Sequence, residues 1–92
     1  MYLVNVIYSE GLMSGREALP YVSDDKDALL KRMFRLYELE LMDGHGRLEE
    51  DTAILNEAEF KDTLDKGFHD DSYFVCLQFK DAHIQFEPEE IL

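Results

Sequence analysis

Two runs of alternating apolar residues near the C-terminus restrict the fold more than any other feature of the sequence. The alternating positions are Tyr73, Val75, Leu77 and Phe79 in the first run and Ile84 and Phe86 in the second. Side chains at every second position of a strand lie on one face, so each run predicts a strand with one buried face. A turn at Asp81–Ala82 would place Phe79 opposite Ile84 and Leu77 opposite Phe86. We therefore expect a C-terminal β-hairpin.

The N-terminal residues also favour strands. Residues 2–8 are apolar on both alternating faces. This is typical of a central strand that is covered on both sides, or covered on one side and partly shielded on the other. Residues 18–22 predict a second, short strand, which Pro20 keeps at an edge because proline cannot donate a ladder hydrogen bond. For the same reason we expect Pro88 to end the last strand, with residues 89–92 as a tail.

A long amphipathic helix is predicted after Ser23. Ser23 or Asp24 supplies the capping side chain, and acidic residues in the first turn suit the helix dipole. At helical spacing the apolar residues form one broad stripe that faces the sheet: Leu29, Leu30, Met33, Phe34, Leu36, Tyr37 and Leu41. The two glycines within residues 43–46 favour a left-handed cap, so we expect the helix to end there.

A second, shorter helix is predicted just before Gly67. Asn56 and Glu59 have the spacing of a capping box, in which each side chain accepts a hydrogen bond from the other residue's backbone. Residues 52–55 predict either a short strand or a lead-in to this helix. Residues 69–72 are typical of a polar turn.

Together these elements predict an α+β fold in a single domain of residues 1–92. We expect a small antiparallel sheet of three to five strands, including the C-terminal β-hairpin, with one long and one shorter helix packed on it. The hydrophobic fraction of 46% is sufficient for a folded core.

The charge distribution is the most unusual property of the chain. The 21 acidic and 9 basic residues give a net charge of −12. Residues 1–47 carry 8 acids and 6 bases, a net charge of −2, whereas residues 48–92 carry 13 acids and 3 bases, a net charge of −10. Such a field repels nucleic acid and anionic membranes and attracts basic surfaces. We expect a protein partner with a basic surface and no direct binding of nucleic acid.

The acidic residues that we expect to contact this partner fall into three groups. A triplet precedes the second helix, three carboxylates share its outer face and two follow it: Glu49, Glu50 and Asp51; Glu59, Asp62 and Asp65; Asp70 and Asp71. Helix residues three or four positions apart have Cβ atoms about 5–6 Å apart. This spacing resembles that of neighbouring phosphates on a nucleic-acid strand, so a carboxylate row can occupy a groove that binds phosphates. The alternative is that acids on an outer helix face only keep the protein soluble.

No sequence motif indicates catalysis or a cofactor. The single cysteine, Cys76, lies in an apolar strand, where a buried thiol is a poor nucleophile. Three histidines lie in separate segments without the paired spacing of zinc ligands: His45, His69 and His83. We therefore expect a protein that is not an enzyme and that has no catalytic residue, cofactor or metal. The alternative is a small enzyme or ligand-binding protein centred on His69, Asp70 and Asp71.

A loop bounded by glycines offers a different kind of contact. Leu12 and Met13 lie between Gly11 and Gly15. Exposed Leu or Met side chains on a loop can anchor a partner, whereas in the other interpretation both fold back over a sheet edge. The alternative function is a protein-interaction module that uses this loop or an open sheet edge, including self-association.

The N-terminus and hydropathy predict the location of the protein. Residues 1–8 lack the basic segment and cleavage site of a signal peptide, and no apolar run reaches the length of a membrane span. We therefore expect a cytoplasmic protein without membrane contact. In size, acidity and α+β pattern the chain resembles small phage-encoded inhibitors of restriction enzymes, CRISPR effectors and other DNA-handling proteins, some of which mimic DNA. This resemblance, of composition without a motif, implies a non-enzymatic protein that binds and inhibits a basic, nucleic-acid-handling partner.

Overall fold

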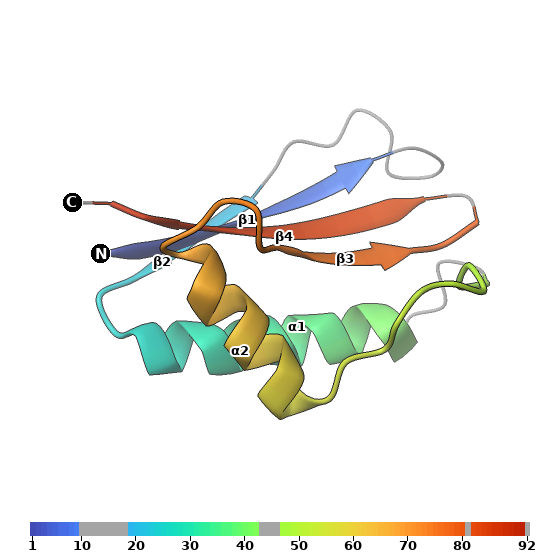
Figure 1. Cartoon of the computed structure of the whole chain (residues 1–92), viewed down its shortest axis with the longest axis horizontal. Helices are drawn as coiled ribbons and strands as arrows, with labels where there is room; N and C mark the ends of the chain where they lie inside the picture. The colour runs from blue at the N-terminus through green and yellow to red at the C-terminus, as the bar shows by residue number, and fades with distance from the viewer. Residues whose placement is uncertain (10–18, 43–46, 81, 92) are drawn as a thin grey trace.

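Four strands and two helices make up the computed structural model, which describes residues 1–9, 19–42, 47–80 and 82–91 (Figure 1). In chain order they are β1 Tyr2–Ser9, β2 Leu19–Ser23, α1 Lys26–Met42, α2 Glu57–Gly67, β3 Val75–Gln78 and β4 His83–Glu90. The expected α+β fold is confirmed, with an antiparallel sheet, a long helix, a shorter helix and a C-terminal hairpin of β3 and β4.

The sheet has the strand order β2-β1-β4-β3, and all its neighbouring strands are antiparallel. β1 and β4 pair along their whole length, from Tyr2 opposite Glu90 to Ser9 opposite His83. The prediction of a central N-terminal strand is confirmed. So is the edge position of β2, where Pro20 lies opposite Asn5.

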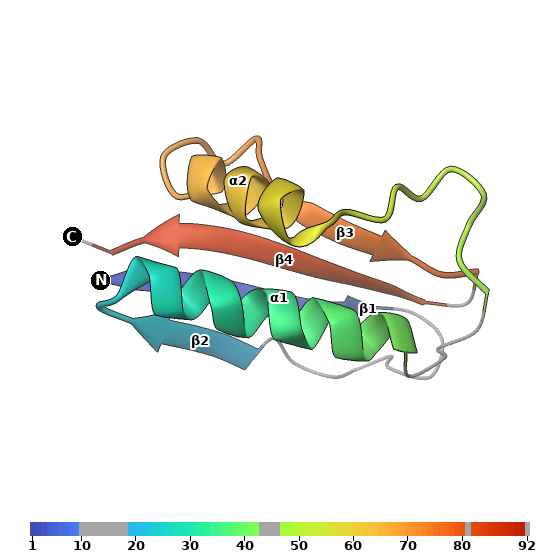
Figure 2. The same cartoon turned by 90° about the horizontal axis from the view of Figure 1, so that it is seen from below.

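Both helices pack on the same face of the sheet (Figures 1 and 2). α1 contacts β1 and β2, whereas α2 contacts β3 and β4. Between the two layers lies one core, whose largest fully buried side chains include Tyr37, Phe60, Phe86 and Met33. On the opposite face of β1, Leu3 is half-buried. The N-terminal strand is therefore covered by helices on one side only.

The start of α1 differs from the prediction by one residue. Asp25 caps the helix, because its Oδ1 accepts a hydrogen bond from Ala28 N–H at 3.1 Å. Ser23 instead stabilises the preceding turn through a hydrogen bond from Asp25 N–H to its Oγ at 3.0 Å. The predicted glycine cap at 43–46 lies outside the described residues. Glu40, on the inner side of the helix, is only 8% exposed and accepts a hydrogen bond from the Tyr8 hydroxyl.

The capping box of α2 is confirmed. Asn56 Oδ1 accepts from Glu59 N–H at 2.8 Å, and Glu59 Oε1 accepts from Asn56 N–H at 3.0 Å. Residues 52–55 form neither of the two predicted elements. They belong to the irregular connection before α2, and Leu55 N–H donates a hydrogen bond to the Tyr37 hydroxyl oxygen at 2.9 Å.

The register of the C-terminal hairpin was predicted wrongly by two residues. Leu77 lies opposite Ile84 and Val75 opposite Phe86, and Phe79 N–H donates to the Ala82 carbonyl at 2.8 Å. A shift of two residues keeps every side chain on the same face. The apolar pattern therefore fits both registers equally well.

The prediction that Pro88 ends the last strand is also wrong. β4 continues to Glu90, with Pro88 opposite Val4. Ladder hydrogen bonds alternate along a strand, and Ile91 N–H donates to Met1 on the β1 side. The Pro88 nitrogen therefore faces the other side of β4, where β3 has not yet begun. The proline interrupts no ladder hydrogen bond.

Candidate functional site

α2 carries the three carboxylates of the predicted row, and two of them have basic partners. Asp62 Oδ2 lies 3.0 Å from Lys66 Nζ. Asp65 Oδ1 lies 2.7 Å from the Nζ of Lys26, which belongs to α1. The side chain of Glu59 accepts the capping-box hydrogen bond from the backbone of Asn56. Glu59 and Asp62 lie on the exposed face as predicted, whereas Asp65 is half-buried and turned toward α1, and all three serve the structure of the helices.

Helix α2 bears little net charge once its ion pairs are included. Glu57 and Lys61 form a third pair. The four carboxylates of α2 thus face three ammonium groups, those of Lys61, Lys66 and Lys26, which leaves a local charge of −1. Hydrogen bonds from Lys26 to Asp65 and from Lys66 to Asp62 raise the pKa of both lysines. Both ammonium groups therefore remain charged at neutral pH.

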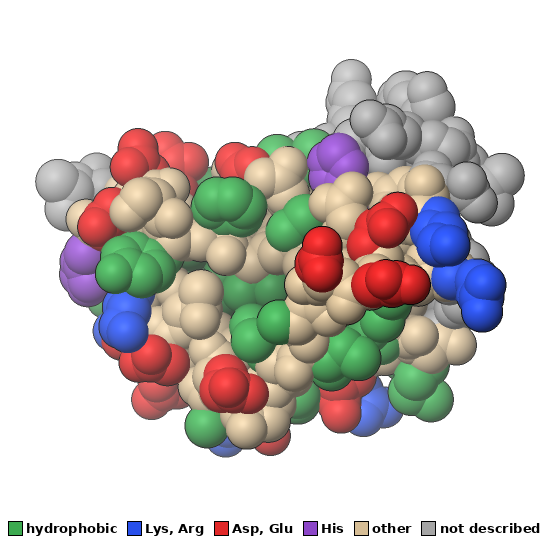
Figure 3. All heavy atoms as spheres, turned by 45° about the vertical axis from the view of Figure 1, so that its right-hand side comes forward, with side chains coloured by type: hydrophobic (Ala, Val, Ile, Leu, Met, Phe, Trp, Pro, Cys, Tyr) green, Lys and Arg blue, Asp and Glu red, His purple; other side chains and the backbone are tan. Residues whose placement is uncertain are grey.

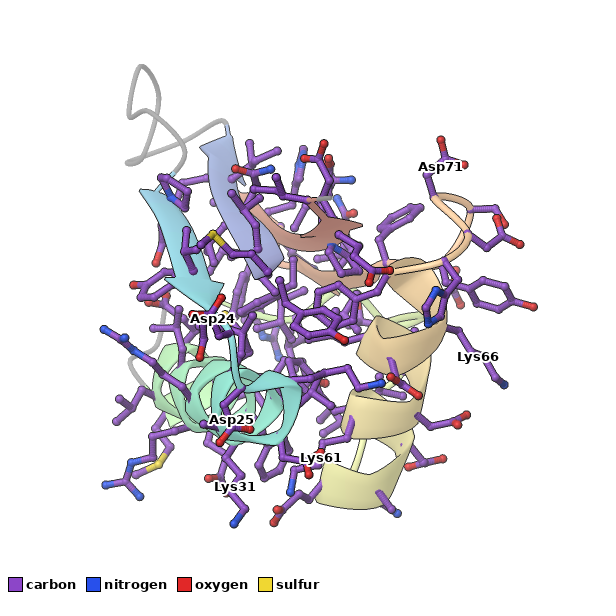
Figure 4. All side chains as sticks on the ribbon, turned by 90° about the vertical axis from the view of Figure 1, so that its left-hand side faces the viewer. Asp24, Asp25, Lys31, Lys61, Lys66 and Asp71 are labelled. Atoms are coloured by element: carbon purple, nitrogen blue, oxygen red, sulfur yellow. The ribbon has the colours of Figure 1, made fainter. Side chains whose placement is uncertain are left out.

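The turn after α2 holds the three residues of the alternative catalytic or ligand site, and all three line one hollow of about 420 Å³. Asp70 Oδ1 accepts hydrogen bonds from the N–H and the hydroxyl of Ser72, at 3.0 Å and 2.6 Å, and these bonds lower the pKa of Asp70. His69 Nδ1 lies 3.5 Å from Glu90 Oε2. Asp71 projects away from the lysines of α2 (Figure 4). Asp70 thus shapes the turn, and no group of three His, Cys, Asp or Glu side chains among the described residues is placed to hold a metal ion.

The predicted triplet Glu49, Glu50 and Asp51 lies beside the edge strand β3. Glu49 N–H donates to the Gln78 carbonyl at 2.9 Å, and the Thr52 hydroxyl donates to the same oxygen at 3.1 Å. Thr52 N–H also donates to the Glu49 carbonyl at 3.0 Å, which closes the turn. These bonds hold the triplet against a strand that lies far from it in the sequence.

A groove runs between this connection and β3, and we call it the β3 groove. It encloses about 500 Å³ and is lined by Glu49, Asp51, Thr52, Ala53, Leu55, Phe74, Val75, Cys76 and Gln78. Figure 3 shows this side of the molecule, where hydrophobic side chains lie deep between raised polar and acidic ones. The β3 groove combines an apolar floor with two carboxylates.

A second hollow, of about 470 Å³, lies over the face of the sheet that the helices leave open. We call it the sheet hollow, and its lining residues are Asn5, Asp71, Tyr73, Phe74, Gln85, Glu87, Pro88 and Glu89. Tyr73 was predicted to continue the buried face of β3. It precedes the strand instead and is 43% exposed. Its ring lies under Lys66 Nζ at 5.7 Å, in a cation–π contact.

Phe74 belongs to both hollows and joins them into one surface, which we call the Phe74 site. Its side chain is 45% exposed. Five carboxylates line the two hollows, and no Lys or Arg does: Glu49, Asp51, Asp71, Glu87 and Glu89. Among the described residues none of these five carboxylates forms an ion pair. The Phe74 site is therefore an acidic surface with an exposed aromatic side chain at its centre.

The structure brings together only part of the predicted contact set. Glu49, Asp51 and Asp71 line the Phe74 site, whereas Glu50 is exposed outside its lining. The other predicted acids lie on α2 or build its following turn. Leu12 and Met13 lie outside the described residues. Sequence reasoning missed Phe74, Glu87 and Glu89, although strand alternation places both glutamates on the face opposite to Phe86.

No helix in the described part of the chain has the length and apolar character needed to cross a membrane. Comparison of the chain with protein-family models, with curated proteins and with solved structures finds no match. The geometry and charge of the Phe74 site are therefore the guide to what the protein does.

Proposed function

We propose that this protein is not an enzyme and acts by binding, through the Phe74 site, a basic surface of a nucleic-acid-handling protein. The observation that carries the proposal is the pair of hollows that share exposed Phe74 and carry five carboxylates without a lining cation. Binding of this kind would inhibit the partner if the contacted surface is the one that holds nucleic acid.

The composition of the site supports protein recognition on physical grounds. Aromatic side chains at the centre of an interface contribute most when the surrounding contacts exclude water from them. A rim of carboxylates accelerates the encounter with a basic surface and rejects acidic ones. Phe74 supplies the first component and the five carboxylates supply the second.

The choice of a nucleic-acid-handling partner follows from charge. A chain of net charge −12 does not approach DNA or RNA directly, because the phosphates repel it. Proteins that bind nucleic acid carry basic surfaces that release ions when an anionic partner binds. An acidic protein can compete for such a surface, and this competition can be measured.

The test is a tagged pull-down from bacterial lysate at low and high salt, with mass spectrometry of the retained proteins. We expect one nucleic-acid-binding protein to be retained at low salt, to be weakened at high salt and to be displaced by DNA. A specific partner held equally at both salt concentrations would contradict the electrostatic proposal. It would favour recognition through apolar contacts.

Two matched triple variants connect the binding to the Phe74 site. Reversal of Glu49, Asp71 and Glu89 to Lys changes the net charge from −12 to −6, since each substitution adds +2. The control reverses by the same amount three exposed acids outside the site that form no ion pair among the described residues, Asp24, Asp27 and Glu38. We expect the first variant to lose the partner at least about a hundredfold more than the control. Equal losses would show that only net charge matters and would contradict the proposed site.

A further inference from the structure

Among the described residues, nothing pairs with the outer edge of β3 along part of its length. On its inner side β3 pairs with β4 from Val75 to Gln78. On its outer side the chain before α2 covers only the far end, where Glu49 N–H donates to Gln78 and Lys80 N–H donates to Arg47, both at 2.9 Å. The strand edge nearer to Phe74 forms the wall of the β3 groove.

The hairpin register identifies the backbone groups on this open edge. Phe79 and Ala82 form the hydrogen-bonded pair next to the turn. Hydrogen-bonded and non-hydrogen-bonded pairs alternate along an antiparallel ladder. Val75 and Leu77 therefore bond to β4, whereas the N–H and C=O of Cys76 face the groove. Within the described residues, no backbone hydrogen bond joins Cys76 to residues 47–55.

An open strand edge beside an apolar groove is the geometry used for strand addition. An extended segment pairs with the edge through its backbone, and its alternate side chains enter flanking pockets. The β3 groove supplies an apolar floor at Leu55 and Phe74 and carboxylates at Glu49 and Asp51. An occupant that fits these features alternates apolar and basic side chains.

We propose that the β3 groove binds an extended basic segment of the partner protein, which adds a fifth strand to the sheet next to β3. The segment's backbone pairs with the N–H and C=O of Cys76, its lysine or arginine side chains contact Glu49 and Asp51, and an apolar side chain packs on Phe74. This inference rests on the proposed function, because it names how the basic partner is held.

Charge complementarity selects this occupant over a second copy of the chain. A second copy carries a net charge of −12 and brings its own Glu49 and Asp51 to the same edge. Like charges placed directly opposite one another across strands are destabilising. A basic segment instead neutralises both carboxylates as it pairs.

The test compares Cys76→Pro with Cys76→Ala. Proline at position 76 removes the outward N–H and leaves the ladder to β4 intact, whereas alanine keeps the N–H and controls for loss of the thiol. The probe is a fluorescein-labelled peptide of alternating lysine and valine, with fluorescence anisotropy measured at low salt. We expect Cys76→Pro to weaken binding about tenfold relative to Cys76→Ala, the loss of about one intermolecular hydrogen bond.

Peptide variants provide a second measurement that does not depend on the folding of Cys76→Pro. N-methylation of alternate residues blocks the hydrogen bonds of one edge of the peptide strand only. Methylation of the edge that faces Cys76 is expected to abolish binding to the wild-type protein, and methylation of the other edge is expected to preserve it. Binding of the unmethylated peptide is also expected to slow alkylation of Cys76, which lines the groove and whose pKa is raised by partial burial.

The outcomes separate this inference from the proposed function. Strand addition would be overturned if both methylated peptides bind equally well. The proposed function would still stand in that case if reversal of Glu49, Asp71 and Glu89 abolishes binding of the partner. Failure of the reversal to weaken capture of the lysate partner would overturn the proposed function itself. If the protein alone forms a dimer, and Cys76→Pro converts that dimer to monomers, the edge of β3 binds a second copy of the chain. This result would overturn the inference.

Discussion

Helix α2 and the Phe74 site are both rich in carboxylates, and they differ in what those carboxylates contact. On α2, Asp62 and Asp65 form ion pairs with lysines, one of them from α1. In the Phe74 site, Glu87 and Glu89 project from β4 at alternate positions with no ion pair among the described residues. The same residue types thus stabilise packing in one region and leave charge available for a partner in the other.

This difference shows why a count of acids along a chain does not locate a binding surface. Solvent screens an exposed ion pair, which contributes about 0–1 kcal/mol, but the pair still cancels the field that a partner would meet. Unpaired carboxylates beside an apolar hollow repel one another slightly and keep their full field. The excess negative charge of residues 48–92 therefore attracts a basic partner mainly at surfaces that contain no lysine.

The largest expected effect on stability is at Gly67, where α2 packs against residues that line the sheet hollow. A Cβ at Gly67, the last residue of α2, would lie 2.2 Å from Pro88 Cγ and 2.5 Å from the Tyr73 carbonyl oxygen. Pro88 and Tyr73 both line the sheet hollow. We expect Gly67→Ala to lower the free energy of unfolding by about 1–3 kcal/mol, since the packed atoms must shift. Urea unfolding measures this change.

The neighbouring exposed residue provides the control for Gly67→Ala. Lys66→Ala removes one surface ion pair and one cation–π contact, and we expect it to lower the free energy of unfolding less than Gly67→Ala does, because solvent screens both contacts. Alanine inside a helix is usually about 1 kcal/mol more favourable than glycine. A Gly67→Ala variant that is more stable than the wild type would therefore show that the sheet hollow can relax without cost.

Strand and helix patterns predicted the elements well because they depend on local periodicity. The capping box of Asn56 and Glu59 lies within one helical turn, and each residue of the apolar stripe of α1 has another stripe residue within four positions of it. The hairpin register was different, since a shift by two residues leaves the apolar face of Leu77 and Phe79 unchanged. The turn geometry decided between the two registers, and Asp81–Ala82 gave no strong turn signal.

The Phe74 site was only partly accessible to prediction because its carboxylates come from three separate segments. Glu49 comes from the connection before α2, Asp71 from the turn after it and Glu89 from β4. Pro88 was expected to end the strand, which placed Glu89 in a tail instead of on the open face. The pair of Lys66 with Asp62 has helical i,i+4 spacing and is readable in the sequence. The pair of Lys26 with Asp65 depends on the packing of two helices.

The next largest effect on stability comes from a hydrogen bond that supports the β3 groove and not the sheet hollow. Tyr37 is 1% exposed, and its hydroxyl oxygen holds the N–H of Leu55, which lines the β3 groove but not the sheet hollow. We expect Tyr37→Phe to lower the free energy of unfolding by about 1–2 kcal/mol, because the Leu55 N–H loses its acceptor. Hydrogen exchange of the Leu55 amide should accelerate in Tyr37→Phe. The control Tyr73→Phe, at an exposed ring, should change neither the free energy of unfolding nor this exchange rate.

The same substitution has a predicted pH dependence. Burial raises the pKa of Tyr37 above the ordinary value of 10.0. The unfolded chain therefore releases this proton at a lower pH than the folded protein, so stability falls as the pH rises above 10.0. The difference in stability between wild type and Tyr37→Phe should be constant below that pH and shrink above it. A constant difference throughout alkaline titration would contradict the buried position of the hydroxyl.

The smallest expected effects are the most direct test of the comparison, because they have opposite signs. Asp62→Asn breaks the ion pair with Lys66, and we expect it to lower the free energy of unfolding by about 0.2–0.5 kcal/mol. Glu89→Gln removes one of two neighbouring unpaired carboxylates, so we expect a gain of a few tenths of a kcal/mol. Both variants change the net charge by the same +1, which cancels the general effect of the chain's acidity. Urea unfolding at low salt measures the two signs, and high salt should reduce both effects through screening. Two losses of equal size would mean that Glu89 has a stabilising partner, and the contrast between α2 and the Phe74 site would then be wrong.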